Sequence, residues 1–155
     1  MSDNSENINI AKLRELAVRG KDYREDYEVE YYGESATFAL RPLVDIEFLP
    51  IAAFLEDKLG LDAEEAQEMV EEEREDNEGN VDPSNFDREF VEIMQKAAIQ
   101  GLTSGPDCDE SEREEVRTQV ESLQGGKSLE IAERVLDVSS DAESAKSFRR
   151  DGSGE

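Results

Sequence analysis

Histidine and tryptophan are absent from this 155-residue chain, and cysteine occurs once, at Cys108. Serine and cysteine triads, histidine-based zinc sites and iron–sulfur centres are therefore excluded, because each needs histidine or several thiolates. Neighbouring carboxylates disfavour the Cys108 thiolate, so we expect a free, unreactive thiol. Paired carboxylates could still act as acid and base, but the sequence shows no aromatic or apolar cleft that would separate their pKa values. We expect no enzyme.

Basic residues are also scarce, with 17 Lys and Arg against 41 Asp and Glu and a formal net charge of −24. Nucleic acid is an improbable partner, because its phosphates need a basic stripe that the chain lacks. No apolar run approaches the roughly 20 residues that span a membrane, and the polar start lacks the apolar core of a signal peptide. We expect an intracellular protein that is not secreted and does not bind a membrane.

The acidic residues are interleaved with apolar residues at the spacings typical of helices and strands, so the chain has the pattern of a folded protein. Together with the acidic excess, this pattern favours a protein adapted to concentrated salt. In molar salt the Debye length falls to about 3 Å, so neighbouring carboxylates scarcely repel one another and their hydration maintains solubility. The high-salt cytoplasm of a halophile is the environment that this composition predicts. An ordinary acidic interaction protein is the alternative.

Two oxygen-rich segments, 76–80 and 107–111, could suggest calcium, but neither fits the twelve-residue calcium loop. That loop requires glycine at its sixth position, where these segments place Val81 and Glu112. Gly125 and Gly126 are more simply a helix stop than part of a phosphate loop. We expect no metal and no cofactor.

The first part of the chain predicts a short helix and then a β-hairpin. Apolar residues from Ile8 to Ala17 recur at mostly helical spacing, and Gly20 stands where that helix would end. Strands at about Tyr27–Tyr32 and Ser35–Arg41 alternate apolar and polar residues on either side of a turn, before Pro42 ends the ladder. In the second strand Ala36, Phe38 and Leu40 alternate with Thr37, Ala39 and Arg41.

The rest of the chain predicts helices, each with a starting signal and an apolar stripe. Asp45 is a candidate cap for a helix that includes Pro50, ends at Gly60 and buries Ile46, Leu49, Ala53 and Phe54. Because Pro50 lacks an N–H, its regular part could begin near Leu49. Asp62 and Glu65 form a capping box for the next helix. Later helices begin near Asp82, Ser111 and Ser128, and their stripes comprise Phe86, Phe90, Ile93, Met94 and Ala97; Val116, Val120 and Leu123; and Ile131, Ala132, Val135 and Leu136.

Serine, glycine and charged residues dominate residues 139–155, which predicts a disordered tail. The expected fold is therefore α+β: a small β-hairpin followed by a mostly α-helical domain, flanked by a short N-terminal helix and a disordered acidic C-terminal tail. The expected boundaries are 1–26 for the N-terminal helix and linker, 27–138 for the hairpin and helical domain, and 139–155 for the tail.

Three groups of residues are candidates for partner binding. The hairpin face could join another chain at its unpaired edges, and the stripe in 86–97 could be a groove, although a core face explains that stripe better. The tail offers one aromatic residue and two cations for weak contacts. The candidates are Tyr27, Val29 and Tyr31; Phe86, Phe90 and Met94; and Phe148, Arg149 and Arg150.

The segment from Tyr27 to Leu43, with its Arg-Pro-Leu end, and the acidic helical part closing at Leu129–Ser140 resemble the tail assembly chaperones of long-tailed viruses, here of a halophile virus or provirus. The resemblance covers about residues 27–140 as a pattern. The N-terminal helix and the very acidic surface depart from common members.

The resemblance implies a non-catalytic protein of the host cytoplasm that coats an aggregation-prone tape-measure protein, self-associates around it and leaves as tail-tube subunits polymerise. Its partners would be the tape-measure and tail-tube proteins. A minor tail or neck protein that stays in the virion is one alternative, and a cellular acidic adaptor or regulator of a halophile is another.

Overall fold

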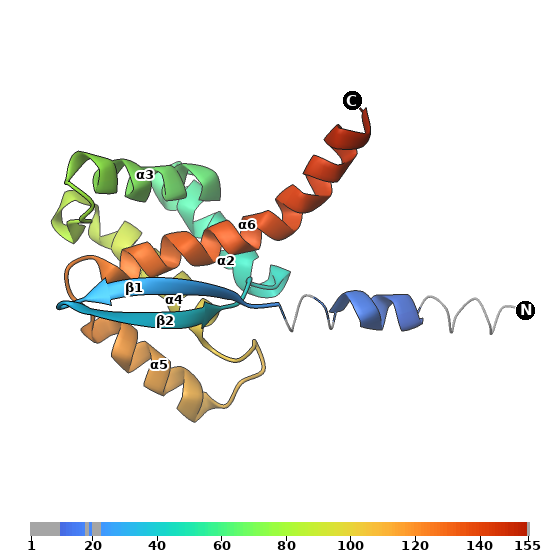
Figure 1. Ribbon diagram of the computed structural model, residues 1–155, viewed down its shortest axis with the longest axis horizontal. Helices are drawn as coiled ribbons and strands as arrows, with labels where there is room; N and C mark the ends of the chain where they lie inside the picture. Colours follow the sequence, from blue (N-terminus) through green and yellow to red (C-terminus); the bar gives the residue numbers. More distant parts are fainter. Residues whose placement is uncertain (1–9, 18, 20–22, 155) are drawn as a thin grey trace, which may run out of the picture.

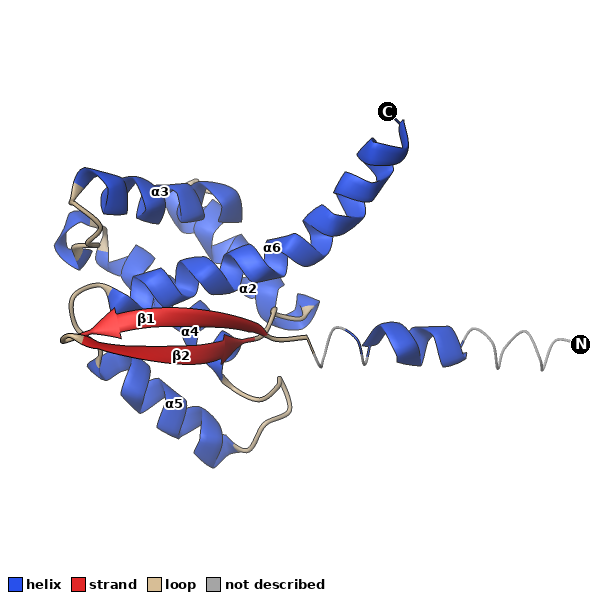
Figure 2. Cartoon of the chain, in the orientation of Figure 1, coloured by secondary structure: helices blue, strands red, loops and turns tan. Residues whose placement is uncertain are grey.

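The computed structural model describes residues 10–17, 19 and 23–154, and for residues 141–154 it describes the backbone alone (Figures 1 and 2). Residues 10–17 are helical and precede a two-stranded hairpin. The further elements are β1 (Glu25–Tyr31), β2 (Glu34–Leu40), α2 (Asp45–Phe54), the π-helical turn η1 (Leu55–Leu59), α3 (Ala63–Asp76), the 3₁₀ turn η2 (Pro83–Asn85), α4 (Arg88–Leu102), α5 (Glu110–Ser122) and α6 (Lys127–Gly154). The expected α+β class, a hairpin followed by helices, is confirmed.

Helices α4 and α6 pack together at the centre of the molecule. The hairpin contacts both, while α3 packs on α6 and α5 packs on α4, on either side of the hairpin in Figure 1. Gly101 of α4 allows this close approach, because a Cβ built there would lie 2.4 Å from Cγ2 of Val135 on α6. The predicted stripe of α6 is confirmed as core, since all four of its members are buried: Ile131, Ala132, Val135 and Leu136.

The hairpin turns at Tyr32 and Gly33, both of which have positive φ values, 52° and 79°. Two-residue turns of this kind match the right-handed twist of the strands, and glycine adopts their geometry without steric cost. Along β1 the burial alternates as predicted, whereas β2 buries only Leu40 and leaves Ala36 exposed and Phe38 36% exposed. The helices thus cover the hairpin along β1, and most of β2 forms an uncovered edge.

Helix α3 begins as its sequence predicts. Asp62 accepts the Glu65 N–H at 2.8 Å, and Glu65 accepts the Asp62 N–H at 2.9 Å, which completes the capping box. The helix expected from Asp82 is instead divided, because Asp82 caps only the short η2 turn before α4 begins at Arg88. Hydrogen bonds from Ser84 hold the pKa of the exposed Asp82 carboxyl below its ordinary value.

Helix α2 buries the face opposite to the predicted one. It begins at Asp45 with Pro50 inside, so the alternative start near Leu49 is wrong. The buried residues are Glu47, Ile51 and Leu55, while Ile46, Leu49 and Ala53 are exposed, and of the predicted set only Phe54 is half-buried. The buried side is apolar as well, with Ile51 and Leu55 fully covered, and it accommodates Glu47 because the partner Arg41 lies inside the fold.

The boundary expected at Ser139 also differs from the structure. Ser139 is buried, and its hydroxyl accepts the Leu43 N–H at 2.9 Å and donates to the Val135 carbonyl at 2.8 Å. The backbone of helix α6 continues from there to Gly154, and the disordered tail expected for residues 139–155 stays a prediction. Residues 139–151 contain neither proline nor glycine, so a helix already nucleated in the core extends at little cost.

Candidate partner-binding surfaces

The predicted hairpin residues face the molecule's own helices. Val29 is buried, and Tyr27 and Tyr31 are half-buried. At the tip of the hairpin, the Tyr31 hydroxyl accepts the Gln124 N–H at 3.0 Å, and the Tyr32 hydroxyl donates to the Gln124 side chain. These bonds tie the hairpin to the loop between α5 and α6. The three predicted residues therefore hold the hairpin on the helices, and the exposed surface of the hairpin belongs mainly to β2.

The predicted stripe before and along α4 lies in the core. Phe90 and Met94 are 1% and 0% exposed, and Phe86 stacks on Phe90 with ring centroids 5.1 Å apart. The sequence pattern allowed either a core face or a groove for a partner, and the structure favours the core face. The third predicted group, Phe148 to Arg150, belongs to the backbone of α6, but its side chains lie outside the described residues.

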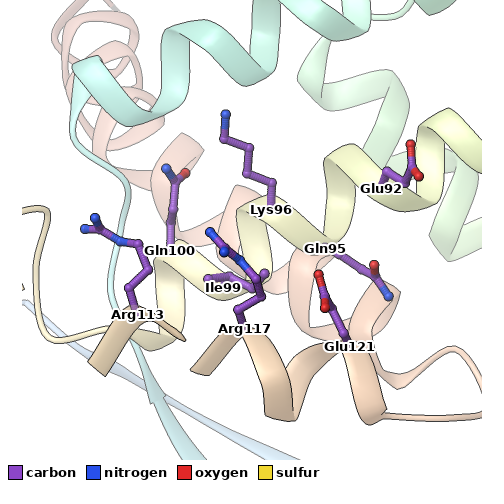
Figure 3. Close-up of a pocket in the computed structure, with 8 residues that line it drawn as sticks. All are labelled: Glu92, Gln95, Lys96, Ile99, Gln100, Arg113, Arg117 and Glu121. Carbon is purple, nitrogen blue, oxygen red and sulfur yellow. The ribbon is translucent and has the colours of Figure 1, made fainter. Parts of the chain in front are cut away.

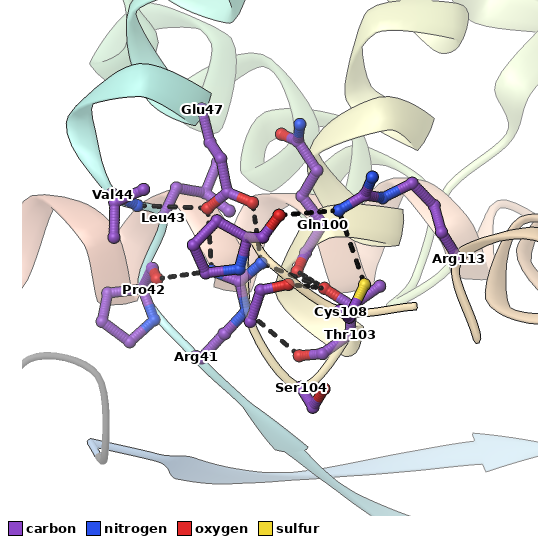
Figure 4. Close-up of polar contacts among 12 residues, drawn as sticks. Arg41, Pro42, Leu43, Val44, Glu47, Gln100, Thr103, Ser104, Cys108 and Arg113 are labelled. Atoms are coloured by element: carbon purple, nitrogen blue, oxygen red, sulfur yellow. Dashed lines mark hydrogen bonds and ion pairs between the residues drawn. The ribbon is translucent and has the colours of Figure 1, made fainter. Parts of the chain in front are cut away.

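The Arg-Pro-Leu segment after β2 forms a buried polar junction (Figure 4). Arg41 is 3% and Glu47 6% exposed, and the guanidinium meets the carboxylate through two parallel bonds of 2.8 and 2.7 Å. Arg41 also donates to the carbonyl and the hydroxyl oxygens of Thr103 at 3.1 and 3.0 Å, and Glu47 accepts the Val44 N–H at 3.2 Å. Buried charges are tolerated when paired and hydrogen-bonded in this way. The junction fixes β2, α2 and the end of α4 to one another.

A second polar cluster joins α3 to α6. Arg74 bonds Glu133, and its Nε lies 3.7 Å from Glu130, which is also 3.2 Å from the Lys127 ammonium. Burial raises the pKa of Glu133 above its ordinary value despite the opposing charge and hydrogen bond of Arg74. Burial lowers the pKa of Arg74, but its bond to Glu133 and the nearby carboxylates raise that pKa overall. Burial, together with the Glu130 charge, raises the pKa of the neighbouring Tyr27.

The outward side of α2, which we call the α2 outer face, comprises Val44, Ile46, Leu49, Pro50 and Ala53. Its large side chains are 38%, 78% and 63% exposed at Val44, Ile46 and Leu49. Exposed carboxylates border it at Asp45, Glu56 and Asp57. The sequence pattern does not distinguish this surface from a core stripe, because both have the same apolar period. The signal that could have revealed it is the pair Ile51 and Leu55, which are four residues apart on the other side of the helix and are both fully buried.

The helical residues 10–17, which we call the N-terminal segment, carry a second exposed apolar stripe. Ile10, Leu13 and Leu16 are 49%, 66% and 62% exposed. In Figure 1 the segment points away from the folded part of the chain, beyond the start of β1. Apolar side chains at helical spacing with no covering element are typical of a surface that binds a partner.

A groove of about 440 Å³ runs between α4 and α5 (Figure 3). Its lining residues are Glu92, Gln95, Lys96, Ile99, Gln100, Arg113, Arg117 and Glu121. Three cations are unusual on so acidic a chain, and they could hold an anionic group. Two of them are already engaged, however, because Arg117 pairs with Glu114 at 2.6 Å and Arg113 donates to the Pro106 carbonyl at 3.0 Å.

Among the residues that the structure describes, no group of three or more Cys, Asp or Glu side chains could hold a metal ion. Within the same part of the chain, none of the helices combines the length and the apolar character needed to cross a membrane. No family model, curated protein or solved structure is similar enough to this chain to count as a match.

Proposed function

We propose that this protein is a non-catalytic tail assembly chaperone of a long-tailed virus or provirus, which binds and solubilises the tape-measure protein while the tail is built. The observation that carries the proposal is the α2 outer face: an exposed apolar stripe on a chain with 41 acidic residues. A contiguous apolar surface with a polar border is typical of a site for another protein.

The mechanism follows from the two sides of α2. The paired Arg41 and Glu47 and the buried Ile51 hold the helix in place, so Ile46 and Leu49 are presented on a rigid support. A tape-measure helix that exposes apolar residues would lay them along this stripe. The surrounding carboxylates would then keep the complex hydrated and separate from other complexes. The chaperone must also be released from the tape-measure protein, which requires a weak contact. A stripe with only three large side chains provides a contact of that kind.

The first test is co-expression with the tape-measure protein encoded in the same genome. We expect the native chain to keep that protein in the soluble fraction, and the Ile46→Asp/Leu49→Asp variant to lose this effect. Thr37→Asp, which changes an exposed residue of β2, is the matched control. Equal solubility with the native and the double-variant chains would contradict the proposal.

A second test separates the chaperone from a minor tail or neck protein. Mass spectrometry of infected or induced cells should find the chain with the tape-measure protein before assembly, and purified particles should lack it. Stoichiometric recovery from mature particles would favour the structural role instead. A gene placed in a cellular operon, with no tape-measure gene beside it, would favour an acidic adaptor or regulator.

We also propose that the chain works in the concentrated salt of a halophile cytoplasm. The support is the formal charge of −24, which repels itself strongly in dilute buffer. Raising potassium chloride from about 0.1 M to several molar should raise the midpoint of thermal unfolding, because the Debye length falls from about 10 Å to 3 Å or less. A midpoint that does not change with salt would contradict this environment.

A further inference from the structure

The N-terminal segment and the α2 outer face are complementary in chemistry. Each presents three large exposed apolar side chains. Those of the N-terminal segment are at helical spacing, as are Ile46 and Leu49 of the α2 outer face, where Val44 lies just before the helix. Residues 10–24 contain five basic and two acidic residues, so this stretch is cationic within a chain of net charge −24. The border of the α2 outer face is acidic on balance, with Asp45, Glu56 and Asp57 exposed beside one exposed cation, Lys58.

The charges of the N-terminal segment are placed to flank its stripe. At about 100° per residue, Ile10, Leu13 and Leu16 share one face of the helix, with Lys12 on one side of them and Arg14 on the other. Glu15 lies on the opposite face, where it pairs with Arg19 at 3.3 Å. The face that carries the apolar stripe is thus bordered by cations, as a helix bound to the α2 outer face requires.

Chain length allows the two surfaces to meet within one molecule. Seven residues separate Ala17 from Glu25 and can span at most about 25 Å. Glu25 is paired with Leu40 across the hairpin, and Leu40 is only six residues before Ile46 on α2. The N-terminal segment is therefore tethered close to the start of the surface that it matches.

The small size of the two surfaces decides between the same chain and a second copy. A stable interface between separate proteins usually buries about 800 Å² and some 20–30 residues on each side, far more than one short helix supplies. A short tether instead supplies an effective concentration in the millimolar range, at which a weak contact becomes populated. The occupant that fits is the chain's own N-terminal segment.

We propose that the N-terminal segment binds the α2 outer face of its own chain, shields it when no partner is bound, and is displaced by the partner. In the structure both apolar stripes are exposed. Because the segment occupies the partner's site, the partner should resemble it: a cationic helix with an apolar stripe. This inference rests on the proposed function for the identity of the site, but the contact itself can be tested with no client present.

The test uses the full chain with Cys108→Ser, so that no native thiol remains. The substitutions Leu13→Cys and Leu49→Cys introduce the pair to be joined, with a short bismaleimide reagent at low micromolar protein. The matched control combines Glu15→Cys, on the opposite face of the segment, with Leu49→Cys. We expect a cross-link within one molecule that forms at least about fivefold more efficiently for the Leu13 pair, as a face-specific tethered contact requires.

Three results would overturn the inference: equal efficiency for the two pairs, no cross-link for either, or a product that joins two molecules. The last result would assign the surface to a second copy. A Lys12→Glu/Arg14→Glu change in the Leu13 pair should reduce the yield in dilute buffer, and an unchanged yield would refute the role of charge. If the cross-link fails while co-expression still solubilises the tape-measure protein, only the self-binding is lost and the proposed function stands.

Discussion

Helices α2 and α4 carry apolar stripes of similar appearance, yet one stripe faces solvent and the other forms the core. Along α4, Phe90 and Met94 are fully buried, and no charged residue shares their face. In α2 the buried face contains Glu47, and Ile46 and Leu49 point outward. The difference teaches that a helix with apolar residues on both sides depends on the rest of the fold for the choice of face. Turning α2 over would expose Ile51 and Leu55 and would leave Arg41 buried without its counter-charge.

The sharpest test of this comparison removes one large side chain from each helix. Phe90→Ala should lower the free energy of unfolding by about 3–5 kcal/mol, because it leaves a cavity in the core. Leu49→Ala on α2 should change it by less than about 0.5 kcal/mol, as expected for an exposed position. Urea unfolding followed by circular dichroism measures both, and similar losses would contradict the assignment of the two faces.

The second test addresses the charge that orients α2. Glu47→Gln should cost about 2–4 kcal/mol, because it keeps the shape of the side chain but leaves Arg41 as a buried cation without its counter-charge. Glu56→Gln, an exposed position beyond the end of α2, is the control and should cost almost nothing. If the two variants unfold at the same urea concentration, the junction does not determine which face is buried.

A third test examines how tightly the core beneath α4 is packed. Gly101→Ala should destabilise the fold by about 1–3 kcal/mol, because the new methyl group would overlap Val135. Combining it with Val135→Ala should recover part of the loss by making room. If the double variant loses as much free energy of unfolding as the two single variants together, the smaller side chain at position 135 does not relieve the overlap, and the two helices adjust independently.

The smallest expected effect concerns pH. Because the pKa of Glu133 is raised in the folded state, its contribution to stability is fully present below its ordinary unfolded pKa and is lost as pH rises through the folded value. Lowering the pH from 7 toward 4.5 should therefore stabilise the native chain more than Glu133→Gln. Glu72→Gln, an exposed position of α3, should retain the native pH dependence. Parallel pH profiles for the native chain and Glu133→Gln would contradict the assignment.

Local rules determined one helix start and the hairpin turn of this protein. The capping box of Asp62 and Glu65 and the turn at Gly33 could be predicted, because each involves residues within a few positions of one another. The stripe of α6 is also predicted correctly, although the helix buries Glu130 as well, which pairs with Lys127 and lies near Arg74. The −24 charge likewise followed from composition alone and underlies the proposed environment.

Only the tertiary structure decided which α2 face is buried, and with it the candidate site. Glu47 turns inward because Arg41 and Thr103, which are 6 and 56 positions away, meet at the end of α4. Ser139 belongs to the fold for a similar reason, since its hydroxyl accepts the N–H of Leu43, 96 positions earlier. The periodicity of a sequence can count apolar residues on a face, but the direction of that face depends on contacts between segments that are distant in the chain.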